Sequence, residues 1–357
     1  MAMSAVGLAT HVYNNTIKSV LLLMFYPVLL FVMVWVFLSF VAPGYNPDMA
    51  GANMREAFGH GFDLTLRHLH WIILFTVTWF TIAYFSHTRL IRASTGSRPV
   101  TRKEYPKLYN MLENLCISRG LPMPRFEIIN SPALNAFASG INERTYTITL
   151  TQGIIDKLED DELEAVIAHE LTHIINRDVR LLIISVIFVG MIGFFAEMIY
   201  RSMVYGGRSR RMGMRGGGRR GGSSGGGKGQ GAVLLIALAV LVIGYTFAIM
   251  TRFALSRKRE YLADAGAVEL TKNPDAMMRA LMRISGRDKI DDMPDDIQQM
   301  CIENSHNFMG MFATHPPIDK RIKTISDMTN TPLPDSYLNN LRQPKSRPWQ
   351  NPPGDGK

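Results

Sequence analysis

The feature that most constrains this chain is a long apolar run without charge at residues 19–42. A helix of that length crosses a hydrocarbon core about 30 Å thick. Further apolar runs cover residues 71–85, 181–196 and 232–250. For the last two runs, the alternative is a buried core helix. We therefore expect a mainly α-helical integral membrane protein with four apolar helices in a lipid bilayer.

The distribution of charge predicts the orientation of the first two runs. The formal net charge is +9, and residues 89–103 contain five Lys and Arg residues. The connection at residues 43–70 contains three acidic and two basic residues. Because Lys and Arg are enriched on the cytoplasmic side of a membrane, the segment after residue 89 is expected on that side.

Composition divides the chain into five regions. We predict an N-terminal transmembrane hairpin at 1–95, soluble parts at 96–180 and 251–342, a second apolar pair at 181–250, and a disordered tail at 343–357. The loop 206–231 inside the apolar pair consists mainly of Gly, Arg and Ser, so it is expected to be flexible. Arg-Gly-Gly sequences also occur in RNA-binding segments, which leaves contact with RNA or anionic lipid open as an alternative.

Local patterns predict the elements of the first soluble part. Apolar residues at helical spacing favour a helix at 105–117, which a Gly-Leu-Pro-Met-Pro sequence ends. Strands are expected at 126–129 and 144–151, the second with the alternation of a half-buried strand. Another helix is expected to begin near Asp161, because Asp161 and Glu164 have capping-box spacing.

This second helix carries an H-E-x-x-H motif, His169-Glu170-Leu171-Thr172-His173. The four-residue spacing places both imidazoles on one helix face, towards a single ion. Zinc lowers the pKa of a bound water to about 7, and Glu170 is placed to take its proton as general base. The chain contains only Cys116 and Cys301, not in a C-x-x-C pair, so no cysteine zinc cluster is expected.

A catalytic zinc takes a third protein ligand and keeps one position open. Glu260 is the candidate, in a helical stretch at 257–264. Asp264 follows it by one turn and is suited to orient a ligating histidine through its free N–H. The alternative is that Glu260 only offsets the three basic residues before it.

Three sets of residues carry a resemblance to a known family. They are His169-Glu170-Leu171-Thr172-His173, then Ser256-Arg257 with Glu260-Tyr261 and Ala263-Asp264, and last His315-Pro316-Pro317 with Arg321. They resemble the HtpX family of bacterial membrane zinc metalloproteases, relatives of the CAAX prenyl proteases, from the first apolar run to about Met328. The resemblance implies a gluzincin-type peptidase domain with a small β-sheet. It also implies one Zn2+ per chain, bound by His169, His173 and Glu260. Asp264 would contact one of these ligands without binding the metal itself.

The resemblance further implies a function and a location. The chain would be a zinc metalloendopeptidase that cleaves membrane proteins or misfolded polypeptides in protein quality control. It would be a multi-pass protein of the bacterial inner (cytoplasmic) membrane, with the active site on the cytoplasmic side. Nucleic acid is not expected as a partner, and the oligomeric state is not predicted. The alternatives are an inactive zinc-bound membrane scaffold, which the retained Glu170 disfavours, and RNA or lipid binding through the Gly/Arg loop.

Further site residues are expected at two places. The four residues Asn135, Ala136, Phe137 and Ala138 resemble the family's edge strand for substrate. An exposed edge strand binds a peptide through backbone hydrogen bonds, whereas the alternative is a simple turn. His315 is the candidate donor to the oxyanion of the attacked carbonyl. The resemblance implies that His315 and Arg321 line the active site, with Arg321 holding substrate or loop in place. The alternative is that His315 only caps the following helix.

The position of the metal relative to the membrane follows from chain connectivity. Both ligand-bearing stretches lie within about 10–15 Å of apolar runs at 1.5 Å per helical residue, so the metal is expected near the membrane surface. Because His169 and Glu260 must bind one ion, the chain between them crosses the membrane twice or not at all. We expect two crossings, which would place the loop 206–231 outside, against the positive-inside rule.

Overall fold

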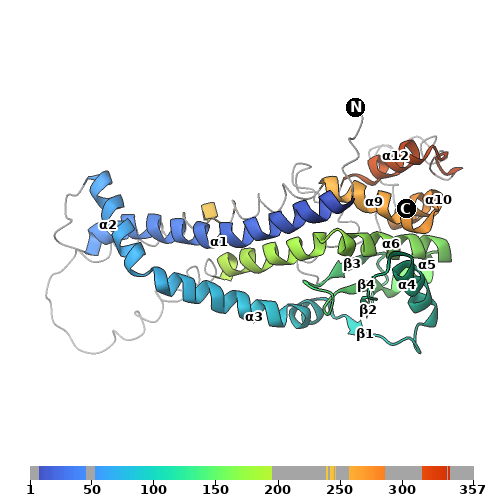
Figure 1. Ribbon diagram of the computed structural model, residues 1–357, viewed down its shortest axis with the longest axis horizontal. Helices are drawn as coiled ribbons and strands as arrows, with labels where there is room; N and C mark the ends of the chain where they lie inside the picture. Colours follow the sequence, from blue (N-terminus) through green and yellow to red (C-terminus); the bar gives the residue numbers. More distant parts are fainter. Residues whose placement is uncertain are drawn as a thin grey trace, which may run out of the picture.

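The structure of the protein is a computed structural model that describes residues 8–45, 53–194, 257–285 and 316–335, with residues 239, 242–244, 246 and 337. Most of the fourth apolar run, the Gly/Arg loop 206–231 and the tail 343–357 lie outside the described residues. In the described part, long helices extend from one side of a mixed domain of helices and strands (Figure 1).

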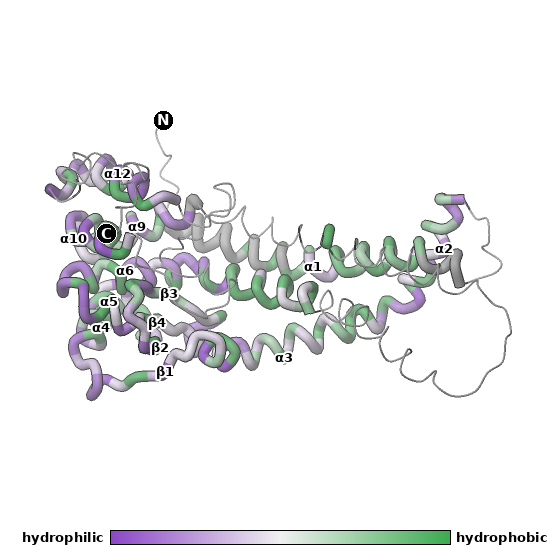
Figure 2. The backbone as a smooth tube through the Cα atoms, turned by 180° about the vertical axis from the view of Figure 1, so that it is seen from behind, coloured by the Kyte–Doolittle hydropathy of each residue, from purple (hydrophilic) through white to green (hydrophobic). Residues whose placement is uncertain are grey.

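The extended side is built from α1 (Leu8–Tyr45), α2 (Met54–Arg67) and α3 (Leu69–Thr95). The window Leu23–Phe40 in α1 and the whole of α3 are long and apolar enough to cross a membrane. These windows are 17% and 11% buried, which differs from the core helix of a soluble protein. Figure 2 shows apolar residues along α1 and α3, whereas α2 also carries hydrophilic stretches. The first two apolar runs are therefore candidate membrane spans.

The third apolar run is a buried helix in the part of the chain that the structure describes. Residues 178–194 form a helical segment that lies between α1 and α3 (Figure 1). The ring of Phe188 stacks on Tyr26 of α1 with centroids 4.5 Å apart and also on Phe80 of α3. Of the four expected apolar helices, two are candidate spans, the third packs between them, and the fourth falls largely outside the described residues.

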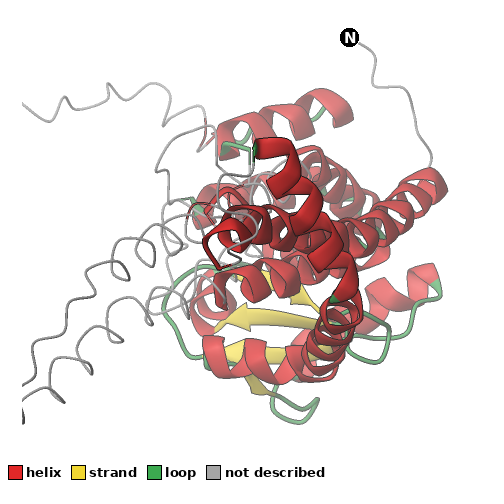
Figure 3. Ribbon diagram, turned by 90° about the vertical axis from the view of Figure 1, so that its left-hand side faces the viewer, coloured by secondary structure: helices red, strands yellow, loops and turns green. Residues whose placement is uncertain are grey.

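Among the described residues, four strands form one sheet in the order β1-β2-β4-β3: β1 (Arg98–Pro99), β2 (Arg125–Ile129), β3 (Ala136–Ser139) and β4 (Thr147–Thr151). Strand β4 runs parallel to β2 and antiparallel to β3. Both predicted strands are confirmed, but the half-buried alternation predicted for the second is wrong. All five residues of β4 are buried, because it lies inside the sheet with both faces covered (Figure 3).

Helices from both soluble parts surround the sheet. They are α4 (Pro106–Arg119), α5 (Gln152–Lys157), α6 (Asp160–Ile175), α9 (Arg257–Thr271), α10 (Pro274–Ile284) and α12 (Ile318–Thr329). The helix predicted at 105–117 is confirmed as α4, which buries Leu108, Leu112 and Leu115. Helix α6 contacts the sheet, α4, α9 and α10, and therefore forms the centre of the domain.

Helix α6 begins one residue before its predicted start and has a different capping box. The N-cap is Glu159, whose backbone N–H donates to Glu162 Oε2 at 3.0 Å. The predicted pairing of Asp161 with Glu164 is therefore wrong. Tertiary contacts explain the difference, because Glu162 is fully buried and its carboxylate accepts hydrogen bonds from two arginines of α10.

Candidate metal centre and active site

The H-E-x-x-H motif lies in the buried middle of α6. His169 is fully buried, Glu170 is buried and His173 is half-buried. The rings of His169 and His173 are neighbours on one helix face, with centroids 4.8 Å apart. The four-residue spacing therefore produces the pair of imidazoles that the sequence predicts.

Helix α9 brings Glu260 to the same point. The two helices approach closely because Gly266 of α9 has no side chain: a Cβ there would lie 2.4 Å from Cγ2 of Thr172. Glu260 Oε2 lies 3.7 Å from His169 Nε2, and its Oε1 lies 3.7 Å from His173 Nε2. The ligand atoms of these residues all lie within 4.8 Å of one another. The structure thus unites the three predicted metal ligands.

The geometry of these three side chains fits a metal ion. Zinc bonds of about 2.0–2.2 Å in a tetrahedron separate the ligand atoms by roughly 3.3–3.6 Å. The two measured separations of 3.7 Å are close to this range. Two histidine nitrogens and one glutamate oxygen are a donor set of catalytic zinc sites. Glu170 is not in the group of potential ligands found among the described residues, which is compatible with the general-base role predicted for it.

Each histidine is held from behind by a carboxylate. His169 Nδ1 lies 3.0 Å from Asp264 Oδ1, and His173 Nδ1 lies 3.2 Å from Asp178 Oδ2. A carboxylate at Nδ1 fixes the tautomer that leaves Nε2 available to a metal and makes the ligand more basic. Asp264 is the partner that the sequence predicts.

Asp178 is a site residue that sequence reasoning missed. It follows His173 by five residues, beyond the end of α6 at Ile175. The chain turns between the two helices through Arg177, whose φ of 58° lies in the left-handed region. The available signal was an acidic residue about one turn after a ligand, the same signal that indicated Asp264. The turn that directs it back to His173 is not readable from the sequence.

Arg321 lies next to the metal ligands as the partner of Asp264. It is 1% exposed, and its Nε and Nη2 donate to the two carboxylate oxygens of Asp264 at 2.9 and 2.6 Å. Its Nη1 lies 3.8 Å from Glu260 Oε2. Burial opposes the charge of Arg321, but the Asp264 and Glu260 carboxylates raise its pKa. Burial likewise opposes the charge of Asp264, while Arg321 lowers its pKa below the ordinary value.

These carboxylates also govern the protonation of His169. Burial opposes the charged imidazolium, but the nearby carboxylates of Asp264 and Glu260 raise the pKa of His169 to about 9. A metal ion must displace this proton when it binds, because only the neutral imidazole is a ligand.

The other predicted site residues have different outcomes. The four residues of the expected substrate strand, Asn135, Ala136, Phe137 and Ala138, lie at the start of β3 and within it, and α6 packs against this strand. Strand β3 is at an edge of the described sheet, as expected. Its expected exposure is wrong, because these residues are 1 to 3% exposed and the strand is covered. His315 lies outside the described residues.

Comparison with known proteins agrees with this geometry. The profile of peptidase family M48 matches residues 102–329. A protein named Protease HtpX homolog from Bacteroides fragilis (strain YCH46) is 44% identical over 331 residues, which cover 90% of this chain and 98% of that protein. A Protease HtpX homolog from Listeria monocytogenes (serotype 4a) is 36% identical over 257 residues, which cover 69% of this chain and 82% of that protein. A solved structure, S. mikatae Ste24p, is 19% identical with a TM-score of 0.44, covering 89% of this chain and 67% of that chain.

The chain therefore belongs to peptidase family M48. Within that family it belongs with the HtpX proteases, so the resemblance noted in its sequence is confirmed. The family implies a peptidase with a metal cofactor, and His169, His173 and Glu260 form the candidate site for that metal.

Proposed function

We propose that this chain is a membrane-embedded, zinc-dependent endopeptidase. The observation that carries the proposal is the approach of the Nε2 atoms of His169 and His173 to the carboxylate of Glu260, with Glu170 beside them on α6. Its substrates are membrane proteins or misfolded polypeptides, and its role is protein quality control. Its location is the bacterial inner membrane, with the active site facing the cytoplasm near the membrane surface.

The reaction is hydrolysis of an internal peptide bond. Zinc, when bound, supplies Lewis-acid polarisation of the attacked carbonyl and lowers the pKa of the attacking water. Glu170 takes the proton from this water as general base and passes it to the leaving amine nitrogen. Asp264 and Asp178 hold the two imidazoles with their Nε2 atoms directed to the ion. His315 is the proposed donor to the oxyanion, and Arg321 holds Asp264 in place.

The path of the chain supports a site near the membrane surface. The helical segment 178–194 begins directly after α6 and packs between the two candidate spans. His173 therefore lies about 7–8 Å along the chain from this segment, at 1.5 Å per helical residue. A peptide segment of a membrane protein can reach such a site while it stays close to the bilayer surface. Strand β3 lies at an edge of the described sheet, the position from which a strand pairs with an extended substrate, although its side chains are buried.

Metal analysis with a matched pair of variants tests the proposal. Glu260→Gln removes a ligand on α9, whereas Glu269→Gln changes an exposed carboxylate of the same helix. We expect zinc in the purified wild type and in Glu269→Gln, with cleavage of a model membrane protein that a chelator stops. Glu260→Gln should bind zinc at least about tenfold more weakly and lose cleavage. Full zinc affinity in Glu260→Gln would refute the ligand assignment.

The same assay separates the two alternative functions. An inactive zinc-bound scaffold would contain the metal and cleave nothing. A protein that binds RNA or anionic lipid through residues 206–231 would keep its binding after chelation. The retained Glu170 beside the metal ligands favours the peptidase over both.

A further inference from the structure

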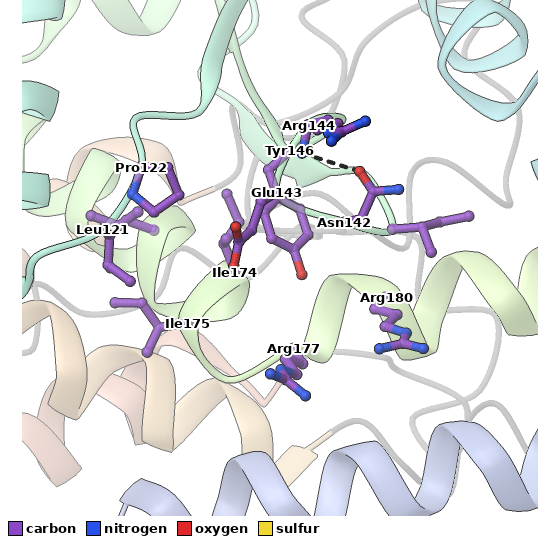
Figure 4. A pocket seen from close by; sticks show the side chains of 12 residues that line it. Leu121, Pro122, Asn142, Glu143, Arg144, Tyr146, Ile174, Ile175, Arg177 and Arg180 are labelled. Carbon is purple, nitrogen blue, oxygen red and sulfur yellow. Dashed lines mark hydrogen bonds between the residues drawn. The ribbon is translucent and has the colours of Figure 1, made fainter. Parts of the chain in front are cut away.

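A cavity lies at the end of α6, apart from the candidate metal ligands. Its volume is about 550 Å³, and none of the three metal ligands lines it. Its walls come from the end of α6, the start of the segment 178–194, the loop between β3 and β4, and the chain between α4 and β2 (Figure 4). The cavity is therefore separate from the three candidate metal ligands, although α6 and the start of the segment 178–194 contribute to both places.

The polar part of the cavity wall is mainly basic. Arg144, Arg177 and Arg180 line it together with the single acidic residue Glu143, which gives the described wall a net positive charge. Figure 4 shows the hydroxyl of Tyr146 directed into the cavity, towards the side where Arg177 and Arg180 lie. Burial raises the pKa of Tyr146, while the charges of Arg177 and Arg180 act on the same hydroxyl in the opposite direction. The three groups therefore face a common space.

Arg180 has unused hydrogen-bonding capacity within this wall. Its Nε is buried and has no hydrogen-bond partner among the described residues. A buried donor of this kind costs free energy unless a ligand or water satisfies it. Guanidinium groups bind phosphate through two parallel hydrogen bonds, so a phosphate is a suitable partner.

The remaining wall is apolar. Leu121, Ile141, Ile174 and Ile175 line it next to the basic side. A free inorganic anion would gain nothing from these residues. A ligand that carries a phosphate and an apolar portion uses both parts of the wall.

The cavity also lies where the domain meets the candidate spans. Asn142, on its wall, donates from Nδ2 to the hydroxyl of Tyr84 in α3 at 2.9 Å. The same helix α3 also contacts the segment 178–194, because Trp79 Nε1 donates to the carbonyl of Ile187 at 3.2 Å. The segment 178–194 thus runs beside α3, and Arg180 lies near its domain end. This is the level at which phospholipid headgroups meet a membrane protein.

We propose that this cavity binds the headgroup of an anionic phospholipid. Arg177 and Arg180 bind the phosphate, and the hydroxyl of Tyr146 donates to it. The apolar wall at Ile174 and Ile175 receives the glycerol and the first acyl carbons. The bound lipid links the end of α6, just past the second histidine ligand, to the membrane surface.

Lipid retention by the full-length protein tests this site. The protein is released from micelles containing phosphatidylglycerol or phosphatidylcholine, and bound lipid is counted by native mass spectrometry. The informative variants are Arg180→Gln and, as a milder change, Tyr146→Phe. The control is Arg89→Gln, which removes the same charge from an exposed position on α3 outside the cavity.

We expect the wild type and Arg89→Gln to retain one phosphatidylglycerol in preference to phosphatidylcholine. Arg180→Gln should bind it about tenfold more weakly because a bidentate charge-assisted contact is lost, and Tyr146→Phe more weakly by a smaller factor. Equal retention by Arg180→Gln and the control would overturn the proposal. Competition by glycerol 1-phosphate at the affinity of the lipid would also overturn it, because the apolar wall would then contribute nothing.

A peptidase measurement distinguishes the lipid site from a substrate subsite. We expect Arg180→Gln to cleave a soluble peptide at the wild-type rate in detergent without added lipid. Loss of this cleavage, with phosphatidylglycerol retention and thermal stability unchanged, would assign the cavity to the substrate and refute the proposal. Lipid retention is measured without any peptide cleavage. The lipid-retention test therefore does not depend on the proposed catalytic function.

Discussion

At the scale of single residues, the metal centre is a buried row of alternating charges. Arg321 binds Asp264, Asp264 binds His169, and His169 faces Glu260. Each of these groups would be costly to bury alone, and each is compensated by a neighbour of opposite charge. Arg321 and Asp264 orient His169 without belonging to the candidate metal group themselves. All four were candidates at the level of the sequence: helical spacing indicated His169 and Asp264, whereas Arg321 and the choice of Glu260 depended on the family resemblance.

Asp264→Asn should weaken zinc binding by about 10–100-fold, the usual effect of removing the carboxylate behind a ligating histidine. It should also destabilise the protein by about 3–5 kcal/mol, because Arg321 would remain buried without its counter-charge. Competition with a chelating dye and thermal unfolding measure the two effects. Asp327→Asn, an exposed change on α12, is the control. Unchanged zinc affinity in Asp264→Asn would refute the proposed orientation of His169.

Zinc uptake by the metal-free protein should depend on pH. The pKa of His169 is raised to about 9, so its imidazole is protonated at pH 7.5 and the metal must displace that proton. Apparent zinc affinity should therefore rise by about tenfold per pH unit from pH 6 to 8. The stability of the metal-free protein should change with pH in the opposite direction. Protonation of His169 stabilises the metal-free fold fully below about pH 6.5, and this stabilisation is lost as the pH rises through 9.

Proton release measures this linkage directly. Zinc added to the metal-free protein in weak buffer at pH 7.5 should release about one proton from His169. Asp264→Asn removes one of the carboxylates that raise the pKa, so it should release less. A zinc affinity independent of pH, with no proton release, would contradict the raised pKa of His169 in the metal-free protein.

At the scale of elements, the site depends on how closely α6 and α9 approach. Gly266 faces Thr172 across this contact, and Thr172 Oγ1 donates to the carbonyl of Ala168 in its own helix. At the start of α6, Arg279 and Arg283 of α10 hold the buried carboxylate of Glu162. Helix α6, which carries two candidate metal ligands, is thus fixed near its start by α10 and near its end by α9, two helices that are distant in the sequence.

Gly266→Ala should separate the two helices and destabilise the protein by about 1–3 kcal/mol, the usual cost of overpacking. Because Glu260 lies on the same helix, zinc affinity should fall as well. Adding Thr172→Ala makes room for the new methyl group and should restore part of the affinity. Gly190→Ala, where a Cβ meets nothing within 4 Å, is the control. Equal zinc affinity in Gly266→Ala and the control would show that the close approach is not required.

The elements show where sequence reasoning succeeds and where it ends. Helix α4 and the strands β2 and β4 were predictable from apolar spacing and turn residues, which are local signals. The burial of both faces of β4 was not, because it depends on the order of strands in the sheet. The capping box of α6 and the contact of Asp178 with His173 likewise depend on tertiary packing.

At the scale of the whole molecule, a partly buried ionic contact joins the candidate span α3 to the domain. Glu127 of β2 is 4% exposed and accepts hydrogen bonds from Arg92 Nε at 3.1 Å and from Ser97 Oγ at 2.6 Å. Arg92 lies in the last turn of α3. The end of α3 is therefore fixed to the sheet, which holds the peptidase domain at one level relative to the membrane.

The path of the chain between α6 and α9 is open to a labelling test. Because both helices contribute to one candidate metal site, the intervening chain is expected to cross the membrane an even number of times, and we expect two crossings. A cysteine placed at Ser223, in a chain with Cys301→Ser, should then react with an impermeant maleimide on intact spheroplasts. Burial raises the pKa of the Cys116 thiol to about 11, so it stays unreactive at neutral pH. Reaction only after lysis would place the Gly/Arg loop on the cytoplasmic side.

The proposal that this chain is a zinc peptidase with Glu170 as its general base is tested most directly by comparing Glu170→Gln with the wild type. Glu170 is buried on α6 beside both histidine ligands but is not part of the candidate metal group. The purified variant should contain as much zinc as the wild type, yet cleave a model membrane protein at least about 10²-fold more slowly, because the proton acceptor is gone. Substantial cleavage by Glu170→Gln at full zinc occupancy would contradict the assignment of Glu170 as the general base.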